Sequence, residues 1–482
     1  MQANWFATFA LLAWPLVAIW LYRTRPIGQA TVWTILGGYL LLPAAWAIKF
    51  PMIPPIDKTT IPSASALIAC LLMSPSGLTA WKRFGLIEIV VLIYVGSPIV
   101  TALLNGDDIV GRGTVLPGVG LYDGLSTAEY QVLQIVPLIL GRQFLRSPRD
   151  TEMALRALVI AALLYSLPML LEVRLSPQLH TWVYGYFPHS FLQQIRAGGF
   201  RPVVFVGHGL LVAFLTMICL LAAAALWRSR TRIGGLPPAA VTMYLSGVLI
   251  LCKSVGPVVY AVILLPVVRF ASARVQLRVA AVLTIAALFY PSLRAADLVP
   301  AETLLSWAAT FSDDRAESLA TRFYNEKKLL DHASERFWFG WGRYGRNRII
   351  DLESGKDESI ADGLWIITMG QLGYVGFLAQ FGLWGLIVFR AVRAAGRISD
   401  PASKTRLATL SILLAVYTID QLPNAPISPL MWLIAGALLG RAEDASRLRR
   451  PARQDNSPPA PDPHAAAGHS STPSKAAFAA MP

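Results

Sequence analysis

The feature that most constrains this chain is a succession of strongly apolar runs separated by polar links. Most are of the length that an α-helix needs to cross the hydrocarbon core of a bilayer, and several are shorter. With 55% hydrophobic and 15% charged residues and a mean hydropathy of +0.52, the chain lies outside the range of soluble globular proteins. We therefore expect an all-α, polytopic integral membrane protein with about twelve to fourteen transmembrane helices. Thirteen runs are predicted as spans: residues 5–22, 31–50, 61–78, 84–104, 128–145, 153–173, 202–227, 238–252, 256–270, 278–291, 362–389, 407–420 and 427–440.

The distribution of positive charge predicts how these spans are oriented. No Lys or Arg precedes the first run, whereas Arg23 and Arg25 follow it, so we expect an uncleaved first span with the N-terminus outside and, after thirteen spans, a cytoplasmic C-terminus. On this topology 25 of the 42 Lys and Arg residues are cytoplasmic and 17 are external, ten of them in one long polar stretch, residues 292–361. Long loops are largely exempt from the orientation rule, and the short loops agree with it.

The same topology divides the chain into four regions. We expect a transmembrane region over residues 1–291, a large external loop with short helices over 292–361, transmembrane helices over 362–440, and a disordered cytoplasmic tail over 441–482. Within the first region the aromatic-rich external segment 174–201 is predicted to lie at the bilayer interface.

Several classes of function are poorly supported by the sequence. The net charge of +14 sits largely in links between spans, and no nucleic-acid motif accompanies it. Cys70, Cys219 and Cys252 fall within apolar runs and offer neither a disulfide framework nor metal-ligand spacing. No Walker loop, dinucleotide fingerprint, zinc signature or nucleophile elbow is present, so we expect no metal or nucleotide cofactor.

The long polar stretch contains a predicted helix with a cationic face. At about 100° per residue, one arc of the helix over residues 314–337 collects basic and polar side chains beside an apolar arc, although Glu326 and Leu329 break the pattern. Such a helix could lie on the bilayer surface and present guanidinium groups and an imidazole to an anionic ligand, or could simply expose a solvated face. The cationic arc consists of Arg315, Arg322, Asn325, His332 and Arg336.

A second group of cations lies where the chain enters a middle span from outside. Arg196 and Arg201 flank a glycine pair that permits close backbone approach, and two guanidinium groups can bind a diphosphate. The alternative is interfacial anchoring. Lys253, in the short external link between two spans, could supply a third cation. His208, placed about two turns into the following span, is either a buried core histidine or a functional one.

Asp362 opens the span that follows the long loop. It is interpreted either as a helix cap or as a general base held near the external cations. Glu88 and Asp420 also lie within or at the ends of spans, and neither is ranked as catalytic.

Three features together are similar to a known family: a large external loop late in the chain, the entry motif Arg196-Ala197-Gly198-Gly199-Phe200-Arg201-Pro202, and Phe339-Gly340-Trp341-Gly342 before the next span. Over about residues 190–440 the chain resembles the O-antigen ligase and polymerase superfamily, including the glycine-spaced run Gly370-Gln371-Leu372-Gly373-Tyr374-Val375-Gly376. The resemblance implies a GT-C-like fold and a metal-independent, inverting glycosyltransferase at the periplasmic face of the bacterial inner membrane. The donor would be a polyprenyl-diphosphate-linked oligosaccharide and the acceptor a glycan or a lipid, with other polysaccharide assembly proteins as partners.

The resemblance also assigns roles to individual residues. Arg196, Arg201 and either Arg315 or Arg322 would hold the donor diphosphate, with Lys253 as a further cation, and Asp362 or His332 would be the base. The chain departs from the family where Lys253-Ser254-Val255-Gly256 replaces a Ser-Arg-Gly turn and Asp362-Gly363 replaces a His-Asn pair. The missing His-Asn pair favours polymerisation of repeat units. The alternatives are an O-antigen ligase, a lipid-linked oligosaccharide flippase, and a non-catalytic scaffold.

Overall fold

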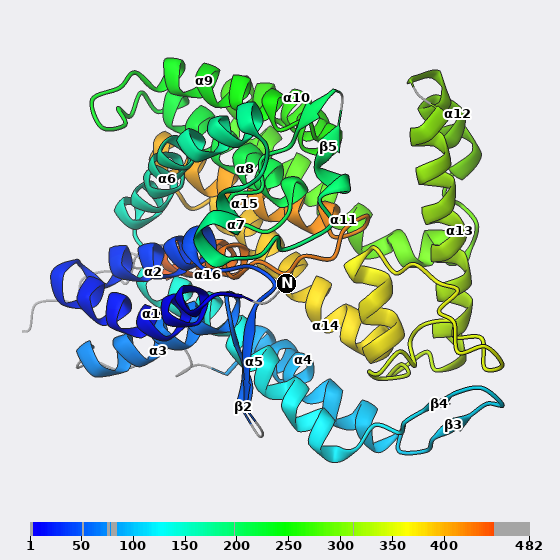
Figure 1. Ribbon diagram of the computed structural model, residues 1–482. Coiled ribbons are helices and arrows are strands. Elements are labelled where there is room, and N and C mark those ends of the chain that lie inside the picture. The colour runs from blue at the N-terminus through cyan, green and yellow to red at the C-terminus, as the bar shows by residue number, and fades with distance from the viewer. Residues whose placement is uncertain are drawn as a thin grey trace, which may run out of the picture.

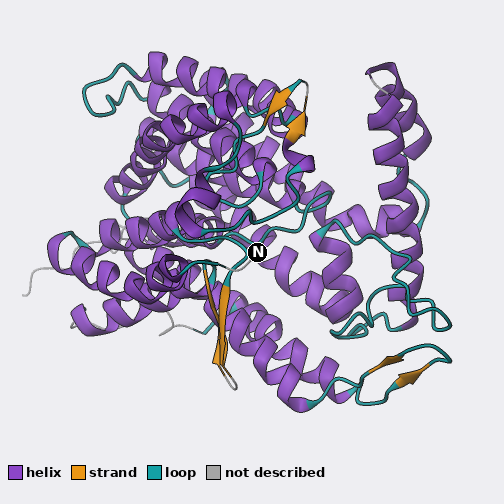
Figure 2. Ribbon diagram, viewed as in Figure 1, coloured by secondary structure: helices purple, strands orange, loops and turns teal. Residues whose placement is uncertain are grey.

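The computed structural model describes residues 3–50, 53–74, 78, 84–196, 198–311 and 313–447, and most of them are helical (Figures 1 and 2). The predicted disordered tail, residues 441–482, is helical over 441–447, where the helix Pro429–Arg447 continues, and from residue 448 it lies outside the described residues. The α-helices are α1 Trp5–Thr24, α2 Ile27–Leu41, α3 Thr60–Met73, α4 Leu86–Leu103, α5 Leu121–Phe144, α6 Pro148–Leu175, α7 Leu179–Tyr184, α8 Gly209–Arg228, α9 Pro238–Leu251, α10 Val255–Phe270, α11 Ala273–Ala295, α12 Ala301–Phe311, α13 Asp313–Glu335, α14 Leu364–Ala395, α15 Pro401–Asp420 and α16 Pro429–Arg447.

Three short antiparallel hairpins lie outside these helices (Figure 2). In the third, Ile195 pairs with Phe200 and Arg196 with Gly199, so the second residue of the glycine pair lies in strand β6, Gly199–Phe200. A single 3-10 turn, Leu192–Gln194, leads into this hairpin. The strands are β1 Ala47–Phe50 with β2 Ile53–Asp57, β3 Ile109–Val110 with β4 Val115–Leu116, and β5 Ile195–Arg196 with β6 Gly199–Phe200.

Each of the thirteen predicted spans overlaps a helix, and several helices extend up to seven residues beyond the predicted run, but two of the runs include long stretches that are not helical. The run 31–50 is wrong in its second half, because α2 ends at Leu41 and the chain then forms a turn and strand β1. Pro43 has no amide hydrogen with which to continue the helix. The run 202–227 starts too early, since α8 begins only at Gly209. Of the described helices, six are long and apolar enough to cross a membrane: α1, α4, α6, α8, α11 and α14.

Helix α8 forms the centre of the bundle. Nearly all of its side chains are buried, and α6, α9, α10 and α15 pack around it. A helix that is apolar on every side is stable when lipid or other helices cover it, and α8 is covered by other helices. The hydrophobic core of the bundle therefore runs along α8. The loop that precedes α8 lies at one end of this core.

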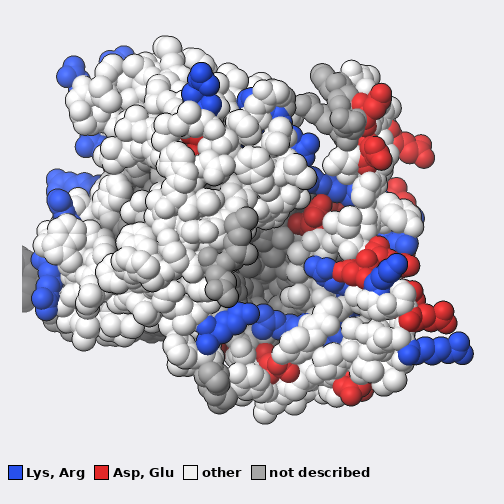
Figure 3. Space-filling model, viewed as in Figure 1, with Lys and Arg blue, Asp and Glu red and all other residues white. Residues whose placement is uncertain are grey.

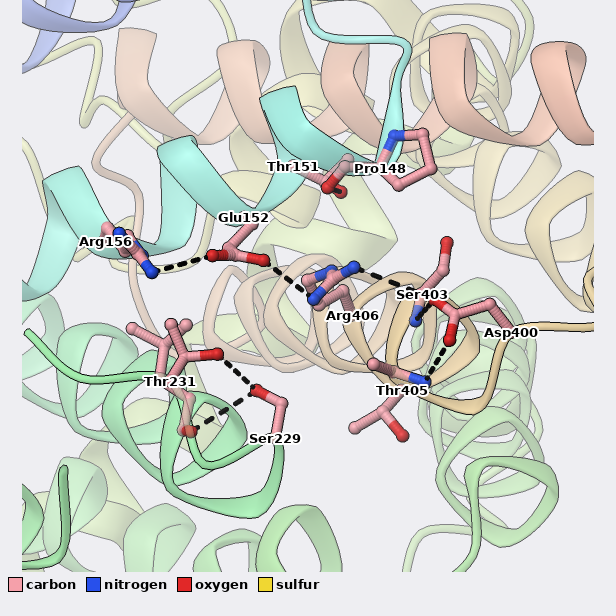
Figure 4. Close-up of polar contacts among 12 residues, drawn as sticks. Pro148, Thr151, Glu152, Arg156, Ser229, Thr231, Asp400, Ser403, Thr405 and Arg406 are labelled. Carbon is pink, nitrogen blue, oxygen red and sulfur yellow. Dashed lines mark hydrogen bonds and ion pairs between the residues drawn. The ribbon is translucent and has the colours of Figure 1, made fainter.

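Ionic groups join the helices at one end of the bundle. Arg142 of α5, which is 7% exposed, lies 2.6 Å from Glu88 of α4 and 2.7 Å from Glu443 of α16. A second group links α6 to α15, where Arg406 donates to Glu152 at 3.0 Å (Figure 4).

The polar stretch predicted as a large loop contains two helices, α12 and α13, which stand beside the bundle at the right of Figure 1. Buried Arg294, near the end of α11, donates to the Phe323 carbonyl of α13 at 2.7 Å. Glu326 of α13 lies 3.7 Å from Arg294 and accepts a 2.8 Å hydrogen bond from Tyr290. Burial raises the pKa of the Glu326 carboxyl. These contacts fix α13 against the ends of α11 and α14.

Candidate functional site

The aromatic and glycine motif that follows α13 docks onto a break in α14. Gly373 has φ 67° and ψ −168°, so α14 is interrupted there. The break frees backbone groups, and the motif satisfies them: Trp341 and Gly342 donate to the carbonyls of Gly370 and Gln371 at 2.8 and 3.0 Å. In return Tyr374 and Val375 donate to Phe337 and Trp338 at 2.7 and 3.1 Å. The two glycine motifs are thus complementary halves of one backbone contact.

The docked segment is also attached to the end of α4. The Thr101 hydroxyl donates to the Phe339 carbonyl at 2.6 Å, and Asn105 donates to the Gly340 carbonyl at 3.0 Å. Arg346, 1% exposed, donates to the carbonyls of Asp107 and Pro117. The motif therefore acts as a structural clamp between α4 and α14, which positions the chain leading to Asp362.

Arg196, Arg201 and Lys253 form one group, here named the hairpin cluster. Lys253 Nζ lies 2.2 Å from where a Cβ on Gly199 would stand, so a side chain at this position would displace the ammonium from strand β6. Arg201 Nη2 donates to the Ser254 hydroxyl at 2.5 Å, next to Lys253. Lys253 itself has φ 50°, an uncommon backbone conformation for a residue with a side chain. The structure thus brings together three of the cations predicted from sequence.

The two arginines of the hairpin cluster lie close together without a carboxylate partner among the described residues. Arg201 is 8% exposed, and both burial and the charge of Arg196 lower the pKa of its guanidinium. Its Nε is buried without a hydrogen-bond partner, and neither arginine forms an ion pair with any residue that the structure describes. Arg201 also lies against Gly209, the first residue of α8, where helix amide groups add further positive potential. Such an arrangement favours an anion.

Glu172 of α6 holds the chain between the hairpin cluster and α8. One of its carboxylate oxygens accepts hydrogen bonds from the amides of Val203 and Val204, both at 2.7 Å, and the other accepts from Leu179 at 2.9 Å. Val204 has φ 46°, which is unusual for a β-branched residue and is held by these bonds. The sequence pattern did not reveal this role, because an acidic residue near the end of a span has many possible partners.

His208 does not lie inside the helix, as the sequence had suggested, but caps its start. Its Nδ1 accepts a 3.1 Å hydrogen bond from the Leu210 amide, and its ring lies 4.7 Å from that of His189. Burial, His189 and Arg201 lower the pKa of His208 to about 4. A neutral imidazole is therefore the form that caps α8 beside the hairpin cluster.

Asp362 and Arg322 form an ion pair. Asp362 Oδ2 lies 3.3 Å from Arg322 Nε, and both side chains are partly exposed, at 44% and 40%. Asp362 does not cap α14, because the N-cap residue is Gly363 and no side chain caps that end. The Gly363 position is tightly packed, since a Cβ there would lie 2.1 Å from the Leu422 carbonyl oxygen. A predicted base and a predicted anion-binding residue are thus in contact at the start of α14.

The rest of the cationic arc of α13 faces the protein. Asn325 is 5% exposed and accepts a hydrogen bond from the Ile360 amide at 2.8 Å. Arg336 donates to Asn105 at 2.6 Å and lies over the Trp341 ring. The segment after α13 thus folds back over Asn325 and Arg336, and the interpretation of the arc as a surface that presents guanidinium groups to an anionic ligand stays a prediction. The side chain of Arg315 lies outside the described residues.

His332 is also held by its neighbours. Its Nε2 lies 2.9 Å from the Arg346 carbonyl oxygen, its Nδ1 lies 3.5 Å from Glu335, and its ring stacks on Trp341 at 4.5 Å. It lies ten residues beyond Arg322 on α13, a distance of about 15 Å along the helix axis. His332 and Asp362 therefore occupy different places, and the structure does not bring them together.

The end of α15 connects the hairpin cluster to the Asp362 region. Tyr260 of α10, six residues after Ser254, lies beside the buried Asp420 at the end of α15. Asn424 donates to Asp420 at 3.1 Å, and its own carbonyl accepts a hydrogen bond from the Leu364 amide at 2.9 Å. The hairpin cluster, Asp420 and Asp362 thus lie in this order in space at one end of the bundle. In the space-filling view, Lys and Arg side chains gather around a hollow beside α14 (Figure 3).

Two further findings bear on what the site can do. Among the described residues, no group of three or more His, Cys, Asp or Glu side chains is close enough to hold a metal ion. Neither a family model nor a curated protein matches the chain.

Proposed function

We propose that the protein is a glycosyltransferase that polymerises lipid-linked polysaccharide repeat units at the periplasmic face of the bacterial inner membrane. The observation that carries the proposal is the hairpin cluster: a buried arginine with an unpartnered Nε–H, a second arginine and a lysine beside the start of α8. Such a group of donors suits a diphosphate, which offers several charged oxygens to arginine and lysine. A polyprenyl diphosphate presents that group at a membrane surface.

The proposed reaction is an inverting displacement. The hydroxyl of an acceptor sugar loses its proton to Asp362, and its oxygen forms a bond to the anomeric carbon of the donor glycan. The bond between that carbon and the phosphate oxygen breaks, and the electron pair leaves with the lipid diphosphate. Arg196, Arg201 and Lys253 stabilise the charge that develops on the leaving group. Asp362 is preferred to His332 as the base because both ring nitrogens of His332 face groups within the protein.

Arg322 has a positioning role in this scheme. Its Nε lies 3.3 Å from Asp362 Oδ2, and this contact directs the carboxylate. The ion pair is partly exposed, so an approaching hydroxyl can reach the carboxylate. Loss of Arg322 is expected to reduce the rate of transfer, while loss of Asp362 removes the base itself.

The test compares variants in a strain that lacks the chromosomal copy. We expect Arg201→Ala and Asp362→Ala to abolish polymer formation, as seen on glycan gels, while immunoblots of membranes show normal amounts of protein. Arg112→Ala is the matched control, since Arg112 is 91% exposed and makes only a 3.8 Å contact with Glu353. Normal polymer in both site variants would remove the assignment.

Two alternative functions give different outcomes. A ligase with the same donor chemistry would leave polymer intact on its lipid carrier when Arg201 or Asp362 is replaced. A flippase would leave repeat units at the cytoplasmic face. The polymerase is favoured by the absence of a His-Asn pair at 362–363, and the hairpin cluster supports polymerase and ligase equally.

A further inference from the structure

A cavity of about 470 Å³ lies between the loop after α2 and the start of α8. It is separate from the hairpin cluster, and none of its residues was singled out by the sequence. Its walls come from four parts of the chain: the end of α2, the β1–β2 hairpin, the approach to α8, and the link before α16. The residues that matter for its chemistry are Tyr39, Trp46, Lys49, Asp57 and Lys58.

Lys58 places a nearly buried ammonium in this cavity. Its side chain is 8% exposed, it donates to the Phe205 carbonyl, and it lies 5.3 Å from the centre of the Tyr39 ring. An ammonium has three N–H groups, so one carbonyl does not satisfy it. Lys58 forms no ion pair with the residues that the structure describes, and burial lowers its pKa to about 7.

The neighbouring carboxylate does not neutralise Lys58. Asp57 Oδ1 accepts hydrogen bonds from the amides of Thr59 and Thr60 at 2.7 and 2.9 Å, and so shapes the turn into α3. The cavity also holds a second cation, because the exposed Lys49 lies in its wall. The cavity is therefore suited to a ligand that carries negative charge.

Trp46 adds an aromatic surface and a free donor. The Trp46 ring lines the cavity, and its Nε1–H is buried without a hydrogen-bond partner in the structure. An indole offers an apolar face to the C–H groups of a sugar ring and an N–H to a hydroxyl oxygen. A sugar with an acidic substituent can place its carboxylate on the ammonium and its C–H groups on the indole face, whereas inorganic phosphate has no C–H groups for that face.

The cavity wall is fixed before any ligand arrives. His180 Nε2 accepts a 3.2 Å hydrogen bond from the Ala44 amide, and its Nδ1 lies 2.8 Å from the Tyr186 carbonyl oxygen. The hydroxyls of Tyr184 and Tyr186 donate to the carbonyls of Leu41 and Ala44. The aromatic segment predicted to lie at the bilayer interface thus holds the loop after α2, and a preformed wall lowers the entropic cost of binding.

We propose that this cavity binds an acidic sugar, with the carboxylate on Lys58 and the sugar ring against Trp46. The cavity and the hairpin cluster both adjoin the start of α8, through Val206 on one side and Arg201 on the other. The sugar is then the acceptor end of the growing glycan, a role that rests on the proposed function. Binding itself does not depend on which reaction the protein catalyses.

The test measures binding of D-glucuronate to the purified full-length protein in detergent by saturation-transfer NMR, with D-glucose and inorganic phosphate as comparison probes. We expect glucuronate to bind at least tenfold more tightly than either. Lys58→Met should remove this preference, while the control Lys356→Met, at an exposed loop position, should keep it. Trp46→Phe keeps an aromatic ring but removes the N–H and the five-membered ring of the indole, so it should weaken glucuronate binding. This second variant keeps the proposal testable if the Lys58 variant misfolds.

The pH dependence supplies a second readout. A carboxylate favours the charged ammonium, so glucuronate affinity should fall about tenfold from pH 6 to pH 8, as Lys58 loses its proton in the empty cavity. The other groups that face Lys58 are Lys49, Asp57, His180 and Tyr39. Equal binding of glucose, phosphate bound as tightly as glucuronate, or an unchanged Lys58→Met variant would each overturn the proposal. None of these results depends on polymer formation, so failure here is distinct from failure of the Arg201 test.

Discussion

Replacement of Gly373 by Ala should disrupt the clamp between the glycine motifs of α14 and the loop after α13. Gly373 has a backbone conformation that is essentially restricted to glycine, which costs another residue about 1–3 kcal/mol. An added Cβ would also lie 2.3 Å from the carbonyl carbon and oxygen of Trp338, so the loop must move. Displacement of the loop would break four backbone hydrogen bonds, each of which contributes roughly 0.5–1.5 kcal/mol to the free energy of unfolding. The combined loss is expected to be about 3–9 kcal/mol.

Gly382, also in α14, provides the matched control. A Cβ there meets no atom within 4 Å, so Gly382→Ala should leave the fold unchanged or stabilise the helix by about 0.8–1 kcal/mol. The assay is denaturant unfolding of both variants in detergent, followed by tryptophan fluorescence, which includes Trp338 and Trp341 of the docked loop. A Gly373→Ala variant as stable as the wild type, or an equal loss in Gly382→Ala, would refute the clamp.

Three further changes test other parts of the structure. Arg142→Met should destabilise the bundle by about 3–5 kcal/mol, since it leaves Glu88, 2% exposed, buried without its cation; Glu88→Gln in the same chain should restore part of the loss in a thermal unfolding assay. Glu172→Gln should cost about 1–3 kcal/mol, because an amide cannot accept all three backbone hydrogen bonds; limited proteolysis that cuts 201–208 no faster than in the wild type would contradict this. Burial lowers the pKa of His180 to about 4, below its ordinary value, so its contribution to stability is complete above pH 6.5 and is lost as pH falls towards 4. His180→Gln should flatten the fall of the melting temperature over that range, and an unchanged slope would contradict the assignment.

Apolar periodicity was sufficient to locate the helices of the bundle, because a bilayer-length helix requires a bilayer-length apolar run. It failed over residues 42–50, where side chains as apolar as those of a span form a turn and a strand. Hydropathy does not distinguish burial in a membrane from burial under the aromatic rings of α7. Pro43 is visible in the sequence as a residue that can end a helix. The turn and strand that follow it, however, depend on packing against the aromatic rings of α7.

The candidate site was predicted in part, and the reason differs from residue to residue. The glycine pair between Arg196 and Arg201 predicted a close backbone approach, and Lys253 makes that approach. Helical periodicity predicted the helix α13 but could not say which of its side chains the following segment would cover. Glu326, which broke that pattern, was the available signal that another face of α13 contacts the protein.

Residues whose roles depend on distant partners were missed. Glu172 binds backbone amides some thirty residues away, and Lys58 contacts the Phe205 carbonyl, far along the chain. No local pattern marks either contact. An acidic residue near the end of a span and a lysine in a turn have many equally ordinary interpretations before the fold is known.

The measurement that tests the central proposal most directly is the glycan profile of a strain lacking this protein, resolved by gel electrophoresis and mass spectrometry beside the wild type. The proposed polymerase predicts single repeat units on the lipid carrier, exposed at the periplasmic face and never extended. Long polymer stranded on its carrier would indicate a ligase instead, and repeat units confined to the cytoplasmic face would contradict glycosyl transfer altogether.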